Sequence, residues 1–164
     1  MTKAFFLDRD GVINQEKKDY VKKLDEFDII EGIADAIKII KNHGFLVIIV
    51  TNQSAVNRKL LSIEMLNKIH KKLKSHLKKN NTSIDKIYFC PHTPSENCKC
   101  RKPKPGLITQ AINDFNIDIS QSFMVGDSET DMEASKSAGC KGILLKKSQT
   151  LLEVVSDLFE SEKR

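Results

Sequence analysis

The sequence predicts an α/β fold in which helices cover both faces of a doubly wound, mainly parallel, Rossmann-like sheet. Short runs of aliphatic and aromatic residues alternate along the chain with segments whose apolar residues recur at helical spacing. Such alternation indicates right-handed crossovers between parallel strands. Several of the apolar runs also end in polar residues, which is typical of open sheets that bind ligands at the carboxyl ends of their strands.

The first elements follow from local composition. Residues 4–7 are an apolar run that ends at Asp8, so we expect a buried strand that leads into a loop. Residues 33–43 carry isoleucines at helical spacing, and Gly44 is a natural end for this helix. Residues 45–50 are almost entirely β-branched or aliphatic, which favours a parallel strand covered on both faces.

The remaining elements continue the alternation. Ser62 is a good N-cap for a helix that runs to about residue 79. The same reasoning predicts strands at 87–89, 122–125 and 142–145, and helices at 106–115, 132–138 and 151–159. Since no repeat, low-complexity segment or linker interrupts this pattern, we expect one domain over residues 1–164.

Composition and charge exclude few functions. The 164 residues are 40% hydrophobic, and no apolar run approaches the roughly 20 residues of a membrane span. Because the N-terminus does not resemble a secretory signal, we expect a cytoplasmic protein without a membrane partner. The net charge of +5 owes much to the lysines of 71–79. Apolar residues at helical spacing place these lysines on the opposite, solvated face of a helix, so no nucleic-acid partner is expected.

Acidic residues at predicted strand ends indicate phosphate chemistry. Asp8 and Asp10 lie two residues apart, where their mutual repulsion would be relieved by Mg²⁺, and Asp127 follows another strand. A carboxylate can also attack phosphorus and form an acyl-phosphate. Taken alone, however, Asp8 and Asp10 could equally be capping a turn.

Two further residues are suited to holding an anion. Lys102 directly precedes a predicted helix, so its charge and the helix N-terminus together favour an anion site. Thr51 and the amides after it are placed to hold other phosphate oxygens. A single loop lysine is usually only solvated. Lys102 and Thr51 therefore indicate a phosphate site only in combination with the acidic strand ends.

A separate cluster of cysteines predicts a metal site. Cys90, His92, Cys98 and Cys100 share one loop and offer three thiolates and one imidazole, a set that suits structural Zn²⁺. Without an export signal, zinc is favoured over disulfides, and reduced, unliganded thiols are the alternative. Cys140 follows a helix-ending glycine and is expected in the core.

The four motifs, in this order, resemble the haloacid dehalogenase superfamily of phosphotransferases. The resemblance implies that Asp8 is the nucleophile and that Asp10 is the acid and then the base. It implies that Thr51 and Lys102 orient the phosphoryl group. It also implies that Mg²⁺ is bound by Asp8, the backbone carbonyl of Asp10, and Asp127. Asp131 is expected to be a helix N-terminal charge, with a second acidic role in the site as the alternative.

Within that superfamily the chain resembles two groups, the D-glycero-D-manno-heptose-1,7-bisphosphate 7-phosphatases and the histidinol-phosphate phosphatases. The strings FFLDRDGVIN, DYV, TNQSA and CRKPKPG favour the heptose group, whereas the short spacing from His92 to Cys98 is also found in the histidinol group. The resemblance implies a phosphatase that acts on a small phosphorylated substrate. The stretches after Asp10 and after Thr51 are too short for an inserted cap domain, so we expect a capless protein, and we expect a monomer. The implied substrate-binding residues are Asp19, Tyr20, Asn52, Gln53, Ser54, Arg58 and Arg101.

The chain departs from the heptose pattern at Ala55, where that group usually has glycine, and at Lys59, which replaces the glycine of an Arg-Gly pair. Ala lacks the backbone freedom of Gly, so the loop after Thr51 and the sugar preference are both open to change. Two other functional classes remain as alternatives. One is a nucleic-acid end-processing phosphatase, suggested by the basic helix, and the other is a non-catalytic zinc-binding domain.

Overall fold

The computed structural model describes residues 1–163 and contains one five-stranded sheet. All four strand pairings are parallel, and the strand order is β3-β2-β1-β4-β5. The strands are β1 (Lys3–Leu7), β2 (Phe45–Asn52), β3 (Lys86–Cys90), β4 (Phe123–Gly126) and β5 (Lys141–Leu144). The predicted α/β fold and its five strands are therefore confirmed, although β2 runs two residues further than predicted and includes Thr51.

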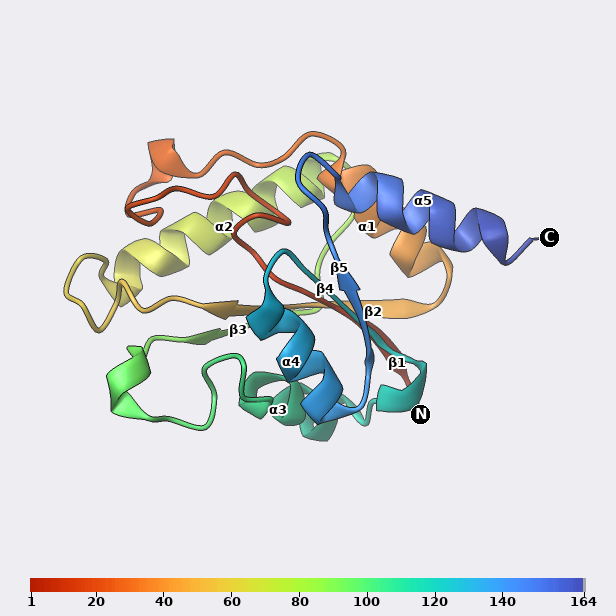
Figure 1. Cartoon of the computed structure of the whole chain (residues 1–164). Coiled ribbons are helices and arrows are strands. Elements are labelled where there is room, and N and C mark those ends of the chain that lie inside the picture. The colour runs from red at the N-terminus through yellow and green to blue at the C-terminus, as the bar shows by residue number, and fades with distance from the viewer. Residues whose placement is uncertain (164) are drawn as a thin grey trace.

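Five α-helices cover the two faces of this sheet. They are α1 (Ile33–Asn42), α2 (Ile63–Lys79), α3 (Gly106–Phe115), α4 (Glu129–Ala138) and α5 (Leu151–Ser161). Helices α1, α2 and α5 lie on one face, and α3 and α4 on the other (Figure 1). The predicted Ser62 cap is confirmed, since its side chain accepts a hydrogen bond from the Met65 N–H at 3.0 Å.

The core is split by the sheet into two layers, as the alternation of side chains along a strand requires. Phe5 and Leu7 of β1 pack with α1, α2 and α5, whereas Phe6 packs with α3 and α4. Helix α2 buries Leu66, Ile69, His70, Leu73 and Leu77. Its lysines are exposed on the opposite side, as the sequence predicted. Cys140 is half-buried at the edge of the second layer and not fully in the core.

The carboxyl ends of the strands share one side of the molecule, opposite the N-terminus and the end of α5 (Figure 1). The sheet order reverses between β1 and β4, and in such sheets a ligand crevice opens at that point. The loop after β1 contains a single 3-10 turn, η1 (Leu24–Glu26), and no inserted cap domain. Within residues 1–163, none of the helices combines the length and apolar character needed to span a membrane.

Candidate active site

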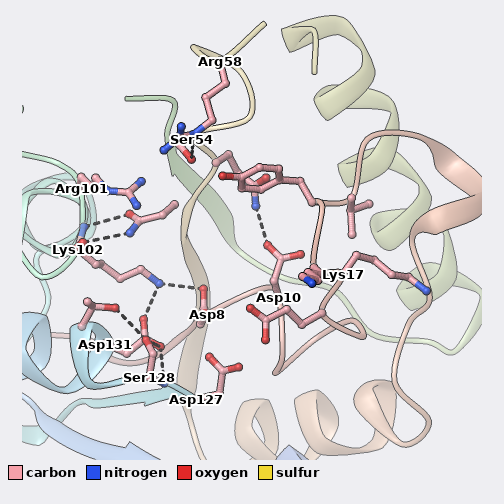
Figure 2. A pocket seen from close by; sticks show the side chains of 17 residues that line it. Asp8, Asp10, Lys17, Ser54, Arg58, Arg101, Lys102, Asp127, Ser128 and Asp131 are labelled. Carbon is pink, nitrogen blue, oxygen red and sulfur yellow. Dashed lines mark hydrogen bonds and ion pairs between the residues drawn. The ribbon is translucent and has the colours of Figure 1, made fainter. Parts of the chain in front are cut away.

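A cleft of about 310 Å³ opens at the reversal point between β1 and β4 (Figure 2). Many of the polar residues predicted at the strand ends line it, namely Asp8, Asp10, Asn52, Gln53, Ser54 and Asp127. Lys102, predicted directly before a helix, also lines it, together with Tyr20, Arg58 and Arg101. Parallel strands thus bring together residues that are far apart in the sequence.

Asp8 lies at the end of β1, and its backbone N–H donates to the Val125 carbonyl at 3.0 Å. Its side chain is 13% exposed and receives a hydrogen bond from the Lys102 ammonium at 2.8 Å. Burial raises the pKa of Asp8 to about 7, and the nearby Asp131 carboxylate adds to this effect while Lys102 opposes it. Burial therefore opposes the charged form of Asp8, and the contact with Lys102 favours it.

Lys102 is almost fully buried and contacts several groups at once. Its Nζ lies 2.8 Å from Asp8 Oδ1 and 2.6 Å from Asp131 Oδ1 (Figure 2). It also lies 2.9 Å from the Val50 carbonyl. Its backbone exchanges two hydrogen bonds with the Asn52 side chain, at 3.0 and 3.1 Å. Although burial disfavours its charge, the two carboxylates outweigh burial and raise the pKa of Lys102. The site therefore contains a fixed cation beside Asp8.

Asp10 is held by donors on both of its oxygens. Oδ1 accepts from Arg9 at 2.8 Å and from Asn14 at 2.9 Å, and Oδ2 accepts from Gln53 at 2.8 Å. Burial alone would raise the pKa of Asp10, but the Arg9 charge and these hydrogen bonds outweigh it and lower the pKa. In the free site the pKa values of Asp8 and Asp10 are therefore shifted in opposite directions.

Three carboxylates can supply oxygens to one cation. Oxygens of Asp8, Asp127 and Asp131 all lie within 4.8 Å of one another. Burial, followed by the Asp131 charge, raises the pKa of Asp127. Gly11 (φ +87°) faces Asp127, and a Cβ at this position would overlap its carboxylate. Crowded hard oxygens of this kind are the ligands that Mg²⁺ prefers, so the residues fit the predicted magnesium site.

Asp131 has both of the roles that were considered for it. Its Oδ2 accepts from Ser128 N at 3.3 Å and Ser128 Oγ at 3.0 Å, which closes a capping box at the start of α4. Its Oδ1 pairs with Lys102. The preference for a purely local, helix-terminal role was therefore incomplete. The same capping box explains why α4 begins at Glu129, three residues before the predicted start.

Two predicted site residues do not line the cleft. Thr51 is fully buried, and its hydroxyl accepts a hydrogen bond from Gln53 Nε2 at 2.9 Å. Asp19 is exposed within a turn closed by the Tyr20 N–H and the Lys17 carbonyl at 3.1 Å, which directs it to solvent. Other lining residues were not predicted, namely Glu16, Lys17, Lys18, Val21, Ser128 and Thr130. Val21 belongs to the DYV string, and the only sequence signal of the others was their closeness to Asp10 or Asp127.

The cysteine loop forms a second cluster beside the cleft. The three pairs among the sulfurs of Cys90, Cys98 and Cys100 are 3.1, 3.6 and 3.6 Å apart. His92 Nδ1 lies 3.3 Å from Cys90 Sγ and 3.2 Å from Cys100 Sγ. With Zn–S bonds of about 2.3 Å, a tetrahedral site has ligand separations of roughly 3.5–3.8 Å. The four donor atoms therefore fit zinc after shifts of a few tenths of an ångström.

The fold and the grouping of Asp8, Asp10, Lys102 and Asp127 at one sheet edge are those that the resemblance to haloacid dehalogenase-type hydrolases implies. In agreement, a family model described as HAD-hydrolase-like matches residues 99–160. A solved structure of D,D-heptose 1,7-bisphosphate phosphatase from B. bronchiseptica, complexed with magnesium and phosphate, superposes with a TM-score of 0.92. It is 31% identical, and the match covers 98% of this chain and 99% of that one.

Curated relatives narrow the family further. D-glycero-beta-D-manno-heptose-1,7-bisphosphate 7-phosphatase from Neisseria meningitidis serogroup A is 42% identical over 143 residues, covering 87% of this chain and 76% of that protein. The Helicobacter pylori protein of the same name (strain 26695) is 44% identical over 144 residues, covering 87% and 83%. The chain therefore belongs to the D-glycero-beta-D-manno-heptose-1,7-bisphosphate 7-phosphatase family.

Proposed function

We propose that this chain hydrolyses the 7-phosphate of D-glycero-D-manno-heptose 1,7-bisphosphate through an aspartyl-phosphate on Asp8. The observation that carries the proposal is the contact of one buried ammonium, Lys102, with Asp8 in a cleft that Asp10 also lines. This arrangement puts a nucleophile, a proton carrier and a fixed positive charge within one site. The substrate is taken from the family to which the chain belongs.

In the first step an oxygen of Asp8 attacks the phosphorus of the 7-phosphate. The bond between phosphorus and the sugar oxygen breaks, and Asp10 gives its proton to that leaving oxygen. Lys102 stabilises the negative charge of the phosphoryl group during transfer. The free site lowers the pKa of Asp10, but a phosphate anion bound beside it raises this pKa again and favours the acid form.

In the second step Asp10 accepts a proton from a water molecule, whose oxygen attacks the phosphorus of the aspartyl-phosphate. The bond between phosphorus and the Asp8 oxygen breaks, which releases inorganic phosphate and restores Asp8. Asp10 serves as an acid and then as a base, so it must keep one orientation through both steps. The donors on its two oxygens supply that orientation.

Bound Mg²⁺ would supply positive charge that lets the anionic nucleophile and the anionic phosphate approach each other. Asp8, Asp127 and the backbone carbonyl of Asp10 are the proposed ligands, and Asp131 lies close enough to orient them. Thr51 lies behind Gln53, so its proposed role toward phosphate is to position the amide of Gln53 and the loop after β2.

The outer part of the cleft is proposed to bind the sugar and its second phosphate. Arg58, Arg101, Lys17 and Lys18 line this part and give it a positive charge suited to an anion. Arg58 Nε donates to Ser54 Oγ at 3.3 Å, and Arg101 donates to the His92 carbonyl at 3.2 Å. We therefore assign the distal part of the substrate to these arginines.

The cysteine loop is proposed to hold a structural zinc ion through Cys90, His92, Cys98 and Cys100. This set of four protein donors leaves no open coordination position for catalysis. The backbone N–H of Arg101 lies 3.4 Å from Cys98 Sγ, and Arg101 directly precedes Lys102 in the sequence. Zinc would thus fix the segment that carries both cations.

We further propose that the chain acts as a single domain and as a monomer, with its thiols kept reduced in the cytoplasm. One sheet includes every strand of residues 1–163, which favours one folding unit. Thiolate ligands of zinc are typical of reducing compartments.

The test is phosphate release from heptose 1,7-bisphosphate and from histidinol phosphate, measured side by side with and without Mg²⁺. We expect a kcat/KM at least 100-fold higher for the heptose, and no turnover without Mg²⁺. Asp8→Asn should abolish activity, whereas Asp157→Asn on the exposed face of α5 should preserve it. Full activity of Asp8→Asn, or preference for histidinol phosphate, would refute the assignment. DNA binding that weakens steeply with salt would instead support nucleic-acid processing.

A further inference from the structure

Arg9, which separates the two acidic residues of the site, is fully buried (0% exposed). One of its nitrogens donates to Asp10 Oδ1 at 2.8 Å, and the guanidinium lies over the Phe27 ring at 5.4 Å from the centroid. Its Nε has no hydrogen-bond partner among residues 1–163. A buried charge with so few acceptors depends strongly on each of them for its orientation.

His70 of α2 supplies the other acceptor. Its Nε2 lies 3.2 Å from Arg9 NH1, and its side chain is almost fully buried. A guanidinium can only donate hydrogen bonds. This contact therefore requires a neutral imidazole with its lone pair on Nε2 and its proton on Nδ1. Burial, and then the charge of Arg9, lower the pKa of His70 to about 3, in agreement with this neutral form.

Packing alone does not explain a histidine at this position. The buried stripe of α2 is otherwise made of leucines and an isoleucine, at Leu66, Ile69, Leu73 and Leu77. An aliphatic residue at position 70 would continue that stripe without burying a polar group. The feature that distinguishes the imidazole from such a residue is its hydrogen bond with Arg9.

We propose that His70 is a positioning residue for the phosphatase reaction. Its Nε2 holds the Arg9 guanidinium in the orientation that directs Arg9 NH2 to Asp10 and so fixes the Asp10 carboxylate toward the cleft. This inference rests on the proposed function, in which Asp10 moves a proton in both steps. Small displacements of such a group lower turnover strongly, even when substrate binding is unchanged.

The test compares two substitutions of one residue. His70→Leu keeps apolar packing but removes the acceptor, and we expect kcat to fall at least tenfold with KM changed by less than twofold. His70→Gln brings an amide oxygen to the place of Nε2 and should restore most of the lost kcat. His76→Leu is the matched control, because His76 lies on the same helix and is not among the residues that line the cleft.

The role of His70 is overturned if His70→Leu keeps kcat within twofold, or if His70→Gln is as impaired as His70→Leu. A second measurement guards against a general folding defect. In an Arg9→Met background, His70→Leu should cause no further fall in kcat, and a further tenfold fall would contradict action through Arg9.

A readout that needs no turnover is the imidazole ¹⁵N spectrum of the unmodified protein. We expect a neutral His70 ring protonated on Nδ1 at pH 6, and an imidazolium or an Nε2–H tautomer would overturn the proposal. Absence of wild-type turnover would refute the proposed function itself. Turnover that does not respond to His70→Leu would refute only the role of His70.

Discussion

Replacement of Lys102 by methionine tests how the site balances its buried charges. The lysine side chain is 3% exposed, and its ammonium pairs with Asp8 at 2.8 Å and with Asp131 at 2.6 Å. Methionine keeps the apolar stem but leaves two carboxylates with no cation in contact. Removal of one partner from a buried ion pair costs about 3–5 kcal/mol. Since Asp131 keeps its bonds from Ser128, we expect a loss near the lower end, about 3 kcal/mol.

The loss is a large part of the total stability of a typical domain, which is about 5–15 kcal/mol. At roughly 2–4 °C per kcal/mol for a protein of this size, it predicts a fall in Tm of about 6–12 °C. Denaturant unfolding of the metal-free protein measures it directly. Lys104→Met is the control, because Lys104 is exposed and its hydrogen bonds to Asn97 and the Cys98 carbonyl are at the surface. We expect it to cost less than about 1 kcal/mol.

A double variant separates stability from catalysis. Adding Asp131→Asn to Lys102→Met removes one of the two uncompensated charges, so part of the stability should return. Phosphate release should stay at least about 100-fold below wild type, because the charge opposite the phosphoryl group is still missing. A loss below about 1 kcal/mol in Lys102→Met would refute the reasoning on burial. Recovery of activity together with stability would refute the role of Lys102 in transfer.

Two further predictions concern zinc and pH. Removal of zinc by a chelator should lower both Tm and kcat, because the cysteine loop leads directly into Arg101 and Lys102. Thermal unfolding and turnover, each measured against zinc content, would check this. A zinc-free protein with an unchanged Tm would contradict it. The folded-state pKa of His70 is lowered to about 3, so its contribution to stability is present above the ordinary pKa of 6.5 and is lost as pH falls toward 3. Between pH 6.5 and 4, the free energy of unfolding of the wild type should therefore fall more steeply than that of His70→Gln. The difference between the two slopes is at most about 1.4 kcal/mol per pH unit. Equal slopes, measured by denaturant unfolding at each pH, would argue against a buried neutral imidazole.

The sheet could be predicted because its signals are local. An apolar run followed by a helical pattern requires no knowledge of distant contacts, and the direction of parallel strands then gathers their polar ends. Asp8 and Asp127 could be placed in one cleft in this way, whereas Lys102 precedes α3 and was assigned to the cleft only in combination with the other motifs. The start of α4 was predicted too late because apolar spacing was given more weight than the Ser128-x-x-Asp131 capping signal.

The missed residues depend on contacts that the sequence does not reveal. The loop that carries Lys17 and Lys18 to the cleft is held from a distance, since the Lys72 ammonium donates to the carbonyls of Leu24 and Phe27 at 2.9 and 3.0 Å. Lys72 itself belongs to a run that was correctly predicted as an exposed helix face, where nothing distinguishes it from its neighbours. His70 is likewise hidden within an apolar stripe.

Asp131 both caps helix α4 and pairs with Lys102, which is distant in the sequence. A carboxylate has two oxygens, and capping of α4 uses only Oδ2, which leaves Oδ1 for Lys102. The short aspartate stem keeps this carboxylate against the end of β4, where a Cβ on Gly126 would overlap it. Glutamate would cap the helix equally well but would move the charge by about one carbon–carbon bond. The site therefore requires Gly126, Ser128 and Asp131 as one unit, although helix formation by itself requires only the cap.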